Sequence, residues 1–477
     1  MTGGIADYES HDAVGLAEKV RKGEVTPGAL LEAAIARVEA RDGALNAVVV
    51  RIFEQARRSA AAALPDGPLR GVPFLIKDLH APIAGVRMTN GSKLFEDLVP
   101  DHDSELVARY RRAGLVLFGR SASPELGVTT STESALFGAT RNPWSTAHSA
   151  GGSSGGAAAA VAAGMLPAAH ASDGGGSIRI PASCCGLFGL KPTRARNPSG
   201  PDVGEGWSGM GVAHAITRSV RDSALLLDAT QGPDLGAPYC APAPERPYLE
   251  EVHRDPGRLR VAVQTESWNG VATHRDCAEA VRDAAQLCAS LGHEVRPARL
   301  RIDPNALGRA TQIVIAANLR AEVLDRAAAL GRALRPDDIE PGTRALVEAA
   351  RTLEAADYAR AIVSMHAVGR KVARFFLDCD VLLTPTLPVP PPLLGRLALS
   401  NTDLERLIED ITATVGFTQL FNATGNPAMS VPLHWNAEGL PIGVQFAGRF
   451  GDEATLLRLA GQLEAARPWF ERRPPPT

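Results

Sequence analysis

Two serines in glycine-rich segments, Ser153 and Ser177, are the residues of this chain whose setting suggests chemistry. The first segment, residues 149–156, reads Ser-Ala-Gly-Gly-Ser-Ser-Gly-Gly, and the second, residues 172–179, reads Ser-Asp-Gly-Gly-Gly-Ser-Ile-Arg. Glycines let backbone N–H groups converge where a side chain would block them. A serine hydroxyl beside such N–H groups can supply a nucleophile and an oxyanion hole within one loop. The two segments therefore predict an acyl-transfer site.

Lys77 is the candidate base for this chemistry. It ends the run Gly-Val-Pro-Phe-Leu-Ile-Lys of residues 71–77, an apolar pattern typical of a strand that is buried on both faces. Such a strand would deliver one amine into the core, although a lysine at a strand end more often extends its ammonium to solvent. Asp78 follows directly, and strand alternation should direct its side chain to the opposite face. We therefore expect Asp78 not to contact Lys77.

The elements between the two serines could bring them together. Residues 157–163 predict a helix with almost no side-chain bulk, and residues 166–169 predict a short strand that leads into the second segment. This order of turn, helix, strand and turn can fold Ser153 back toward Ser177. Helical and strand patterns alternate along the rest of the chain, for example a helix that starts at Pro27 after a Thr26 cap. Such alternation is typical of an α/β fold.

Composition and charge narrow the classes of function. The chain has 477 residues, of which 45% are hydrophobic, 22% charged and 5% aromatic, with a net charge of −3. This balance provides no field or stacking surface that favours nucleic acid, and no segment has the bulky apolar residues of a membrane span. The first residues lack the basic and apolar regions of a secretory signal. We expect a cytoplasmic protein with no nucleic-acid and no membrane partner.

The six cysteines do not suggest a metal site. They stand at positions 184, 185, 240, 277, 288 and 379, without a CxxC pair or a zinc-type Cys/His spacing. In a chain of this length, free thiols buried in a reducing compartment are the common case. We therefore expect no metal.

Three other interpretations of the glycine-rich segments are weaker. Residues 151–155 match the GxSxG of an α/β-hydrolase nucleophile elbow, but that motif should directly follow a strand, and residues 142–148 suggest a turn. A phosphate-binding loop would carry a GxxxxGK[ST] motif, which is absent, and would avoid a carboxylate such as Asp173. A flexible linker would not be followed by ordered-looking apolar segments.

The motifs together resemble the amidase signature family. The resemblance rests on Gly-Gly-Ser-Ser-Gly-Gly at 151–156, Ser-Asp-Gly-Gly-Gly-Ser-Ile-Arg-Ile-Pro at 172–181 and Cys-Gly-Leu-Phe-Gly-Leu-Lys-Pro-Thr at 185–193. The interval of 24 positions between Ser153 and Ser177 matches that family as well. Further matches at 72–78, 141–144, 217–222, 427–432 and 439–445 extend the resemblance over nearly the whole chain.

The resemblance implies an α/β fold in which helices on both faces sandwich a central, mixed and twisted β-sheet. It also implies a single large amidase domain, residues 1–477. We expect N-terminal helices at 10–65, the signature core at 66–230, a variable region around the substrate pocket at 231–380, and C-terminal core strands with a helix at 381–465.

Carried to this chain, the family's triad implies Ser177 as nucleophile, Ser153 as a bridging serine in a cis peptide bond with its predecessor, and Lys77 as base. Lys77 must be neutral to accept a proton, so its pKa has to fall by several units from about 10.4. Burial at the end of an apolar strand lowers the pKa in that direction. Ser153 would then relay protons between Ser177 and Lys77. The implied oxyanion hole consists of the backbone N–H groups of Gly174, Gly175, Gly176 and Ser177.

Other residues near the loop are expected to support it. Asp173 and Ser154 are candidates for loop support or substrate contact. Arg179 could bind a substrate carboxylate, but an internal ion pair with Asp173 or another acid is the commoner arrangement. We expect His170 to be packed and hydrogen-bonded rather than catalytic.

Two departures from the family pattern stand in this loop. Ser172 occupies a position that the family usually gives to threonine, and it keeps the hydroxyl group. Gly174 occupies a position that the family usually gives to a larger residue, so we expect a looser or more open oxyanion loop.

The resemblance implies an enzyme, an amidase that hydrolyses the C–N bond of linear or cyclic carboxamides through an acyl-enzyme on Ser177. It implies a small-molecule amide and water as partners and no metal or organic cofactor, and it leaves a homodimer open. Within the family, the chain resembles the 6-aminohexanoate-cyclic-dimer hydrolases at His170 and at residues 139–144, 240–248 and 432–435. Two alternatives stay open: the glutamine-hydrolysing amidase subunit of a tRNA-dependent amidotransferase, and a non-catalytic scaffold that keeps the fold.

Overall fold

Helices and strands alternate along the chain, as the sequence predicts for an α/β protein. The computed structural model describes residue 5 and residues 7–475. The strands are β1 (Val48–Arg51), β2 (Pro73–Lys77), β3 (Val116–Ser121), β4 (Glu133–Ser134), β5 (Gly138–Ala139), β6 (Arg141–Asn142), β7 (Ser145–Ser149), β8 (Ala168–Asp173), β9 (Phe188–Lys191), β10 (Val212–Thr217), β11 (Arg260–Val263), β12 (Glu294–Pro297), β13 (Val381–Pro385), β14 (Ala428–Trp435) and β15 (Pro441–Gly448). The α-helices are α1 (Ala13–Arg21), α2 (Pro27–Leu45), α3 (Phe53–Ala61), α4 (Glu105–Arg112), α5 (Gly155–Ala162), α6 (Arg179–Cys185), α7 (Val220–Thr230), α8 (Tyr248–Val252), α9 (Arg275–Ser290), α10 (Pro304–Ala329), α11 (Pro341–Ala349), α12 (Ala355–Phe375), α13 (Leu404–Thr414), α14 (Gln419–Thr424) and α15 (Glu453–Ala466). Short 3-10 helices are η1 (Tyr8–Ser10), η2 (Lys93–Phe95), η3 (Glu125–Gly127) and η4 (Ala350–Thr352).

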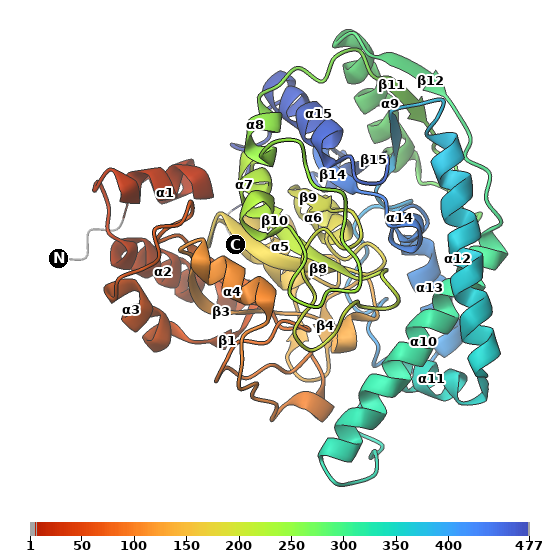
Figure 1. Cartoon of the computed structure of the whole chain (residues 1–477), viewed down its shortest axis with the longest axis horizontal. Coiled ribbons are helices and arrows are strands. Elements are labelled where there is room, and N and C mark those ends of the chain that lie inside the picture. The colour runs from red at the N-terminus through yellow and green to blue at the C-terminus, as the bar shows by residue number, and fades with distance from the viewer. Residues whose placement is uncertain (1–4, 6, 476–477) are drawn as a thin grey trace.

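One 11-stranded sheet forms the centre of the molecule, and helices cover both of its faces (Figure 1). The strand order is β1-β3-β2-β8-β10-β9-β14-β15-β13-β11-β12. The sheet is mixed, because β2 runs parallel to β3 and β8, and β11 runs parallel to β12 and β13, while the other neighbours are antiparallel. The predicted fold class is therefore confirmed. All four predicted regions contribute strands to this sheet, which supports the single large domain that we retain as a proposal.

The strand that ends at Lys77 has the burial that its sequence predicts. Every residue of β2 is buried, since the strand lies inside the sheet between β3 and β8 and is covered on both faces. The N-terminal helices pack near this part of the sheet, and α2 begins at Pro27 as expected, with the Thr26 hydroxyl accepting a hydrogen bond from the Ala29 N–H at 3.1 Å. Lys77, the last residue of β2, is fully buried.

Helix α5 lies in the middle of the core because its side chains are small. All of its residues are buried, and the helix packs against strand β8. A Cβ on Gly156 would lie 2.3 Å from the Ala122 nitrogen and 2.7 Å from the Ala47 oxygen, so the helix backbone directly contacts the neighbouring chain. This close packing fixes the start of α5, where Ser153 and Ser154 stand.

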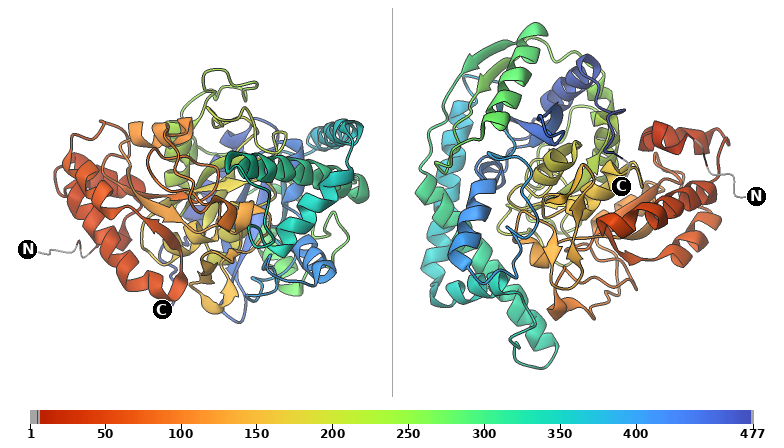
Figure 2. Two further views of the ribbon diagram at one scale, coloured as in Figure 1. Left: turned by 90° about the horizontal axis from the view of Figure 1, so that it is seen from below. Right: turned by 180° about the vertical axis from the view of Figure 1, so that it is seen from behind.

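Helices α10 and α12 lie side by side along one flank of the molecule, in the region expected to surround the substrate (Figures 1 and 2). Their apolar faces join a core cluster that also contains Met210, Trp268, Phe417 and Phe421, with Trp207 packed against it. This cluster brings the loop before β10, the helical flank and the segment around α14 together beside the carboxyl end of β8.

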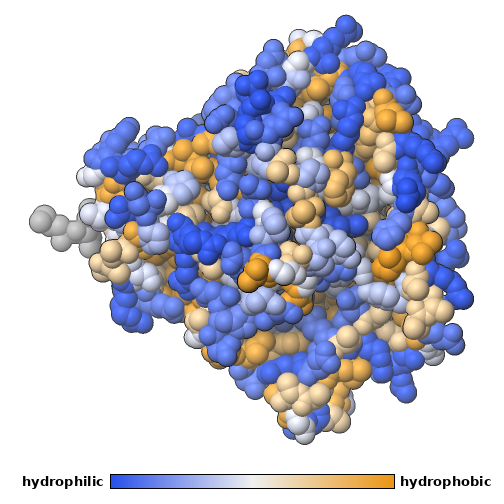
Figure 3. Space-filling view, in the orientation of Figure 1, coloured by the Kyte–Doolittle hydropathy of each residue, from blue (hydrophilic) through white to orange (hydrophobic). Residues whose placement is uncertain are grey.

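The face shown in Figure 3 is mostly hydrophilic, with apolar residues in separate patches. No helix in the described part of the chain combines the length and the apolar character needed to cross a membrane.

Candidate active site

The amine of Lys77 is buried at the end of β2. The side chain is 0% exposed, and Nζ donates hydrogen bonds to Ser153 Oγ at 2.8 Å and to Ser172 Oγ at 3.0 Å. Burial lowers the pKa of Lys77 from 10.5 to about 7, and the charge of Asp173 opposes this change without cancelling it. The amine can therefore be neutral near pH 7, which is the state that a proton acceptor requires.

Asp78 does not contact the Lys77 amine. Its carboxylate accepts hydrogen bonds from the backbone and the hydroxyl of Thr89, and it lies 3.9 Å from the Arg120 guanidinium. The expected alternation of the two side chains is confirmed. Burial raises the pKa of Asp78, and its carboxyl group is bonded elsewhere, so it does not stabilise the ammonium form of Lys77.

Ser153 lies in the turn between β7 and α5. The peptide bond between Gly152 and Ser153 is cis, as the family resemblance implies. The Ser153 side chain is 2% exposed, and its Oγ accepts the hydrogen bond from Lys77. The turn therefore presents one hydroxyl to the buried amine.

Residues 143–144 form a turn as predicted, but residues 145–149 form strand β7, so our prediction that a turn directly precedes the motif was wrong. β7 pairs with β6 in a separate two-stranded sheet, and its pairing with Arg141 and Asn142 was not visible in the local sequence. The GxSxG motif therefore does follow a strand. Its serine is nevertheless hydrogen-bonded to a lysine and, within the described residues, to no histidine, which still separates it from the α/β-hydrolase elbow.

Strand β8 is longer at its carboxyl end than the predicted 166–169, and this places two more side chains at Lys77. It continues to Asp173, and alternation puts His170 and Ser172 on one side of the strand. His170 Nδ1 accepts a hydrogen bond from the Lys77 N–H at 3.2 Å, and Ser172 Oγ accepts one from Lys77 Nζ. Our sequence reasoning missed Ser172 as a partner of the lysine, although the His-x-Ser spacing was the available signal.

His170 and Ser154 support the surroundings of the lysine. Burial lowers the pKa of His170 to about 3, so its ring is neutral and accepts the Lys77 hydrogen bond, as expected for a packed histidine. Ser154 Oγ hydrogen-bonds to the backbone oxygen of Ser172 at 3.2 Å and accepts from its nitrogen at 3.3 Å. The serine turn and β8 are therefore tied together by Ser154.

Ser177 stands between the glycine loop and α6. It follows Gly176, whose φ of 137° favours glycine, and its side chain is 8% exposed. Its hydroxyl makes no hydrogen bond within the described part of the chain. The structure thus brings Lys77, Ser153 and Ser172 into direct contact and leaves the Ser177 hydroxyl unlinked to Ser153.

The N–H groups of the glycine loop do not all remain available. Gly176 donates its N–H to Asp173 Oδ1 at 2.7 Å, so its place in the predicted oxyanion hole is corrected. The N–H groups of Gly174, Gly175 and Ser177 have no hydrogen-bond partner among the described residues. The N–H groups of three of the four predicted residues can therefore donate to a ligand, whereas the Gly176 N–H helps to fix the shape of the loop.

Asp173 and Arg179 form a buried ion pair that holds the loop. Arg179 Nη2 and Nε lie 2.9 Å from the two carboxylate oxygens, and both side chains are 0% exposed. Burial would raise the pKa of Asp173, but the charge and hydrogen bonds of Arg179 outweigh it and hold that pKa well below its ordinary value. Arg179 is therefore paired internally with Asp173, which is the commoner of the two arrangements that we considered. It is not free to bind a substrate carboxylate.

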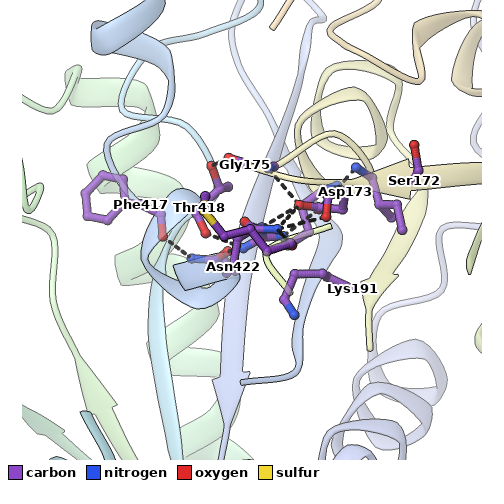
Figure 4. Close-up of polar contacts among 12 residues, drawn as sticks. Ser172, Asp173, Gly175, Lys191, Phe417, Thr418 and Asn422 are labelled. Carbon is purple, nitrogen blue, oxygen red and sulfur yellow. Dashed lines mark hydrogen bonds and ion pairs between the residues drawn. The ribbon is translucent and has the colours of Figure 1, made fainter. Parts of the chain in front are cut away.

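Residues near α14 complete this network, and the sequence carried no signal for them (Figure 4). Asn422 Nδ2 donates to Asp173 Oδ1 at 2.8 Å, and its Oδ1 accepts from Arg179 Nη2 at 2.7 Å. Thr418 Oγ1 donates to the Gly175 oxygen at 2.6 Å. The loop is therefore held from a segment about 240 positions further along the chain.

Gly174 does not leave the loop open, and our expectation of a looser loop was wrong on this side. A Cβ there would lie 2.7 Å from a ring atom of Trp207, whose indole occupies the space. The indole can occupy this position only because residue 174 has no side chain.

No group of three or more His, Cys, Asp or Glu side chains that could hold a metal ion occurs within residue 5 and residues 7–475. The six cysteines are free, and all but Cys240 are buried.

The site and the fold agree with comparisons to known proteins. The family model described as Amidase matches residues 29–457, so the chain belongs to the amidase family. It is a hydrolase that acts on amide carbon–nitrogen bonds.

Individual relatives cover nearly the whole chain. The 6-aminohexanoate-cyclic-dimer hydrolase of Pseudomonas sp. (strain NK87) is 41% identical over 97% of this chain and 96% of its own length. A solved structure of 6-aminohexanoate cyclic dimer hydrolase is 40% identical, with a TM-score of 0.92 over 98% of this chain and 99% of that one. A glutamyl-tRNA(Gln) amidotransferase subunit of Thermotoga maritima is less similar, at 26% identity and a TM-score of 0.77 over 97% and 96%. The amidotransferase alternative is therefore not favoured.

Proposed function

We propose that this amidase uses Ser177 as nucleophile, Ser153 as proton bridge and Lys77 as base. The observation that carries the proposal is the 2.8 Å hydrogen bond between Lys77 Nζ and Ser153 Oγ, made by an amine whose pKa is lowered to about 7. Ser153 can give its hydroxyl proton to the neutral amine only if it receives a proton from another donor in turn. Ser177, at the end of the adjacent loop, is the donor that completes the relay.

The proposed reaction has two halves with the same proton path. Ser177 Oγ attacks the amide carbonyl carbon, its proton passes to Ser153, and the proton of Ser153 passes to Lys77. The protonated lysine returns the proton by the same path to the leaving nitrogen as the C–N bond breaks. Water then attacks the acyl-enzyme ester and loses its proton to the relay, and Ser177 leaves with a proton. Catalytic hydrogen bonds often tighten only with substrate bound, so Ser177 has to turn toward Ser153 in the first step.

The oxyanion hole that we propose is smaller than the predicted one. The N–H groups of Gly174, Gly175 and Ser177 are unpaired within the described residues, whereas that of Gly176 is taken by Asp173. Backbone donors aimed at the carbonyl oxygen stabilise the charge that develops on it in the transition state. Asp173, Arg179 and Ser154 hold the loop and do not touch the substrate.

We propose linear and cyclic carboxamides as the substrates, including cyclic dimers of 6-aminohexanoate. The support is similarity: the relative of that name is 41% identical over 97% of this chain. The reaction needs water and the amide alone, and we propose no metal or organic cofactor. A cytoplasmic location and a homodimer are also proposals, which fractionation and light scattering would test.

A serine-reactive phosphonate tests the triad. We expect it to label the wild-type chain and not Ser177→Ala, with Ser153→Ala and Lys77→Met labelled much more slowly. A panel of amides, including glutamine, aryl anilides and cyclic oligoamides, would be followed by mass spectrometry with Ser177→Ala as the blank. Labelling of Ser177→Ala at the wild-type rate would refute Ser177 as nucleophile. If glutamine were the only amide hydrolysed, with release of ammonia, the amidotransferase alternative would be favoured instead.

A further inference from the structure

Trp207 packs its indole against Gly174, at the start of the loop that carries Ser177. An ideal Cβ on Gly174 would lie 2.7 Å from Cζ3 and 2.8 Å from Cε3 of Trp207, so the six-membered part of the indole takes the place of a side chain there. A Cβ on the next residue, Gly175, would meet nothing within 4 Å. The loop is therefore covered by an aromatic ring at Gly174 and borders open space at Gly175.

Part of the Ser177 loop and its aromatic neighbour are accessible to solvent. Ser177 itself is buried, whereas Ser172, Gly174, Gly175 and Trp207 are partly exposed. Because Trp207 packs on Gly174, three residues before Ser177, and is partly exposed, it presents an apolar surface beside the loop.

The loop that carries Trp207 is closed and tied to the nucleophile loop. Gly206 and Gly211 form an isolated β-bridge, with the Gly211 N–H donating to the Gly206 oxygen at 2.9 Å. Asn422 Nδ2 donates both to the Met210 oxygen, at 3.1 Å, and to Asp173 Oδ1, at 2.8 Å. One amide group thus fixes the Trp207 loop relative to the Ser177 loop.

Contacts on the outer side of this loop hold the indole further. Trp207 and Ser208 have φ values of 48° and 53°, a left-handed conformation that a bulky residue keeps only where its surroundings impose it. The Ser208 hydroxyl hydrogen-bonds to the Tyr358 hydroxyl of α12, which also accepts from Asn318 Nδ2 of α10 at 3.2 Å. The variable helices therefore position the ring.

We infer that Trp207 is a specificity-determining residue, and that Gly174 is the glycine that lets its ring reach the site. The indole forms a fixed apolar wall on which the hydrocarbon part of an amide packs, next to the scissile carbonyl. The substrates favoured are amides flanked by unbranched methylene chains or by flat apolar rings. Amides with an anionic group close to the carbonyl are disfavoured, because the ring cannot solvate a charge. This inference rests on the proposed function.

Two series of amides, one of anilides with growing acyl chains and one with growing alkyl chains on the nitrogen, test the apolar wall formed by Trp207. In one series the acyl chain grows from acetyl to octanoyl, and in the other the alkyl chain on the nitrogen grows over the same range. We expect the wild-type kcat/KM to rise with length in at least one series. Trp207→Leu should lower it about 10-fold for the longest member and less than about 3-fold for the shortest, since the lost contact is apolar area. Tyr239→Leu, which removes an exposed aromatic side chain elsewhere, is the matched control.

A double-mutant cycle tests the pairing with Gly174. Gly174→Ala should displace the indole and lower kcat/KM for long chains, and the same change should have a much smaller effect in the Trp207→Leu background. Circular dichroism and thermal unfolding verify that each variant is folded. Length dependence that is identical in wild type and Trp207→Leu, in both series, would overturn the inference.

A binding readout separates this inference from the proposed function. In the Ser177→Ala background, addition of the octanoyl anilide should shift tryptophan emission, and Trp207→Phe should abolish the shift. If the wild type hydrolyses no amide, the proposed function fails, while the emission titration still decides whether Trp207 lines a binding site. Absence of an emission change with saturating anilide would count against the wall even in an active enzyme.

Discussion

Lys77 Nζ donates a hydrogen bond of 2.8 Å to Ser153 Oγ across 76 positions of sequence, and both groups are shielded from water. The lysine comes from a strand inside the sheet and the serine from a turn that opens a helix of small residues. Burial disfavours the ammonium form, so the contact joins a hydroxyl to an amine that is neutral over much of the physiological range. The charge state of this amine should therefore govern both activity and stability.

The acid limb of the pH–rate profile should report Lys77. Because the neutral amine is the active form and its pKa is about 7, kcat/KM should be level above pH 7 and fall about tenfold per unit well below it. Lys191 is another buried lysine with a pKa lowered to about 7, so Lys191→Met is the control. This variant should keep the acid limb of the profile at the wild-type pH. A profile that stays flat down to pH 5 would exclude lysine as base.

The stability of the chain should also depend on pH through Lys77. Between about 7 and 10.5 the unfolded chain holds a proton on this lysine that the folded chain does not, so stability rises with pH across that window. Lys77→Met removes the free-energy cost of deprotonating this lysine when the chain folds. We expect its Tm to exceed that of the wild type at pH 7 and the difference to shrink as pH approaches 10. A difference that is the same at both ends of the window would contradict this.

Ser172→Ala should move the acid limb to lower pH. The Ser172 hydroxyl accepts a hydrogen bond from Lys77 Nζ at 3.0 Å and so favours the charged amine. One lost hydrogen bond corresponds to a shift of about half a unit to one unit in the pKa. Ser172→Thr, which restores the family's usual residue, should keep the wild-type limb. The idea fails if the alanine variant titrates where the wild type does.

Arg179→Met should destabilise the protein strongly. It leaves the Asp173 carboxylate buried without its cation, and breaking a buried pair on one side costs about 3–5 kcal/mol. The double variant Asp173→Asn with Arg179→Met removes both charges and should recover part of the lost free energy of unfolding. Urea unfolding measures both values. Equal losses in the single and the double variant would show that the pair does not act as a unit.

Gly156→Ala should destabilise the fold, although alanine favours a helix. The added Cβ would lie 2.3 Å from the Ala122 nitrogen, a backbone atom that cannot move aside. Gly369→Ala in α12 is the matched control, because a Cβ there meets nothing within 4 Å. It should stabilise the protein by about 0.5–1 kcal/mol in urea unfolding. A Gly156→Ala variant as stable as the wild type would mean that α5 can shift away from its neighbours.

Some of the site was predictable because local patterns encode it. The apolar run that ends at Lys77 predicts a buried strand, and burial alone lowers the pKa of that lysine. The glycine-rich segments predict turns at Ser153 and Ser177, and their motifs match a family whose fold this chain has. The strand and turn inferences depend on neighbours within about ten residues, where side-chain size and periodicity act directly.

The tertiary structure decided which atoms these residues meet. The loop at Ser177 is held by Thr418 and Asn422, and Gly174 is covered by Trp207, yet none of these three partners stands in a motif that points to the loop. The orientation of the Gly176 N–H toward Asp173 likewise depends on the finished loop. A sequence pattern records burial and turns along the chain, whereas hydrogen bonds between distant segments form only when the core packs them side by side.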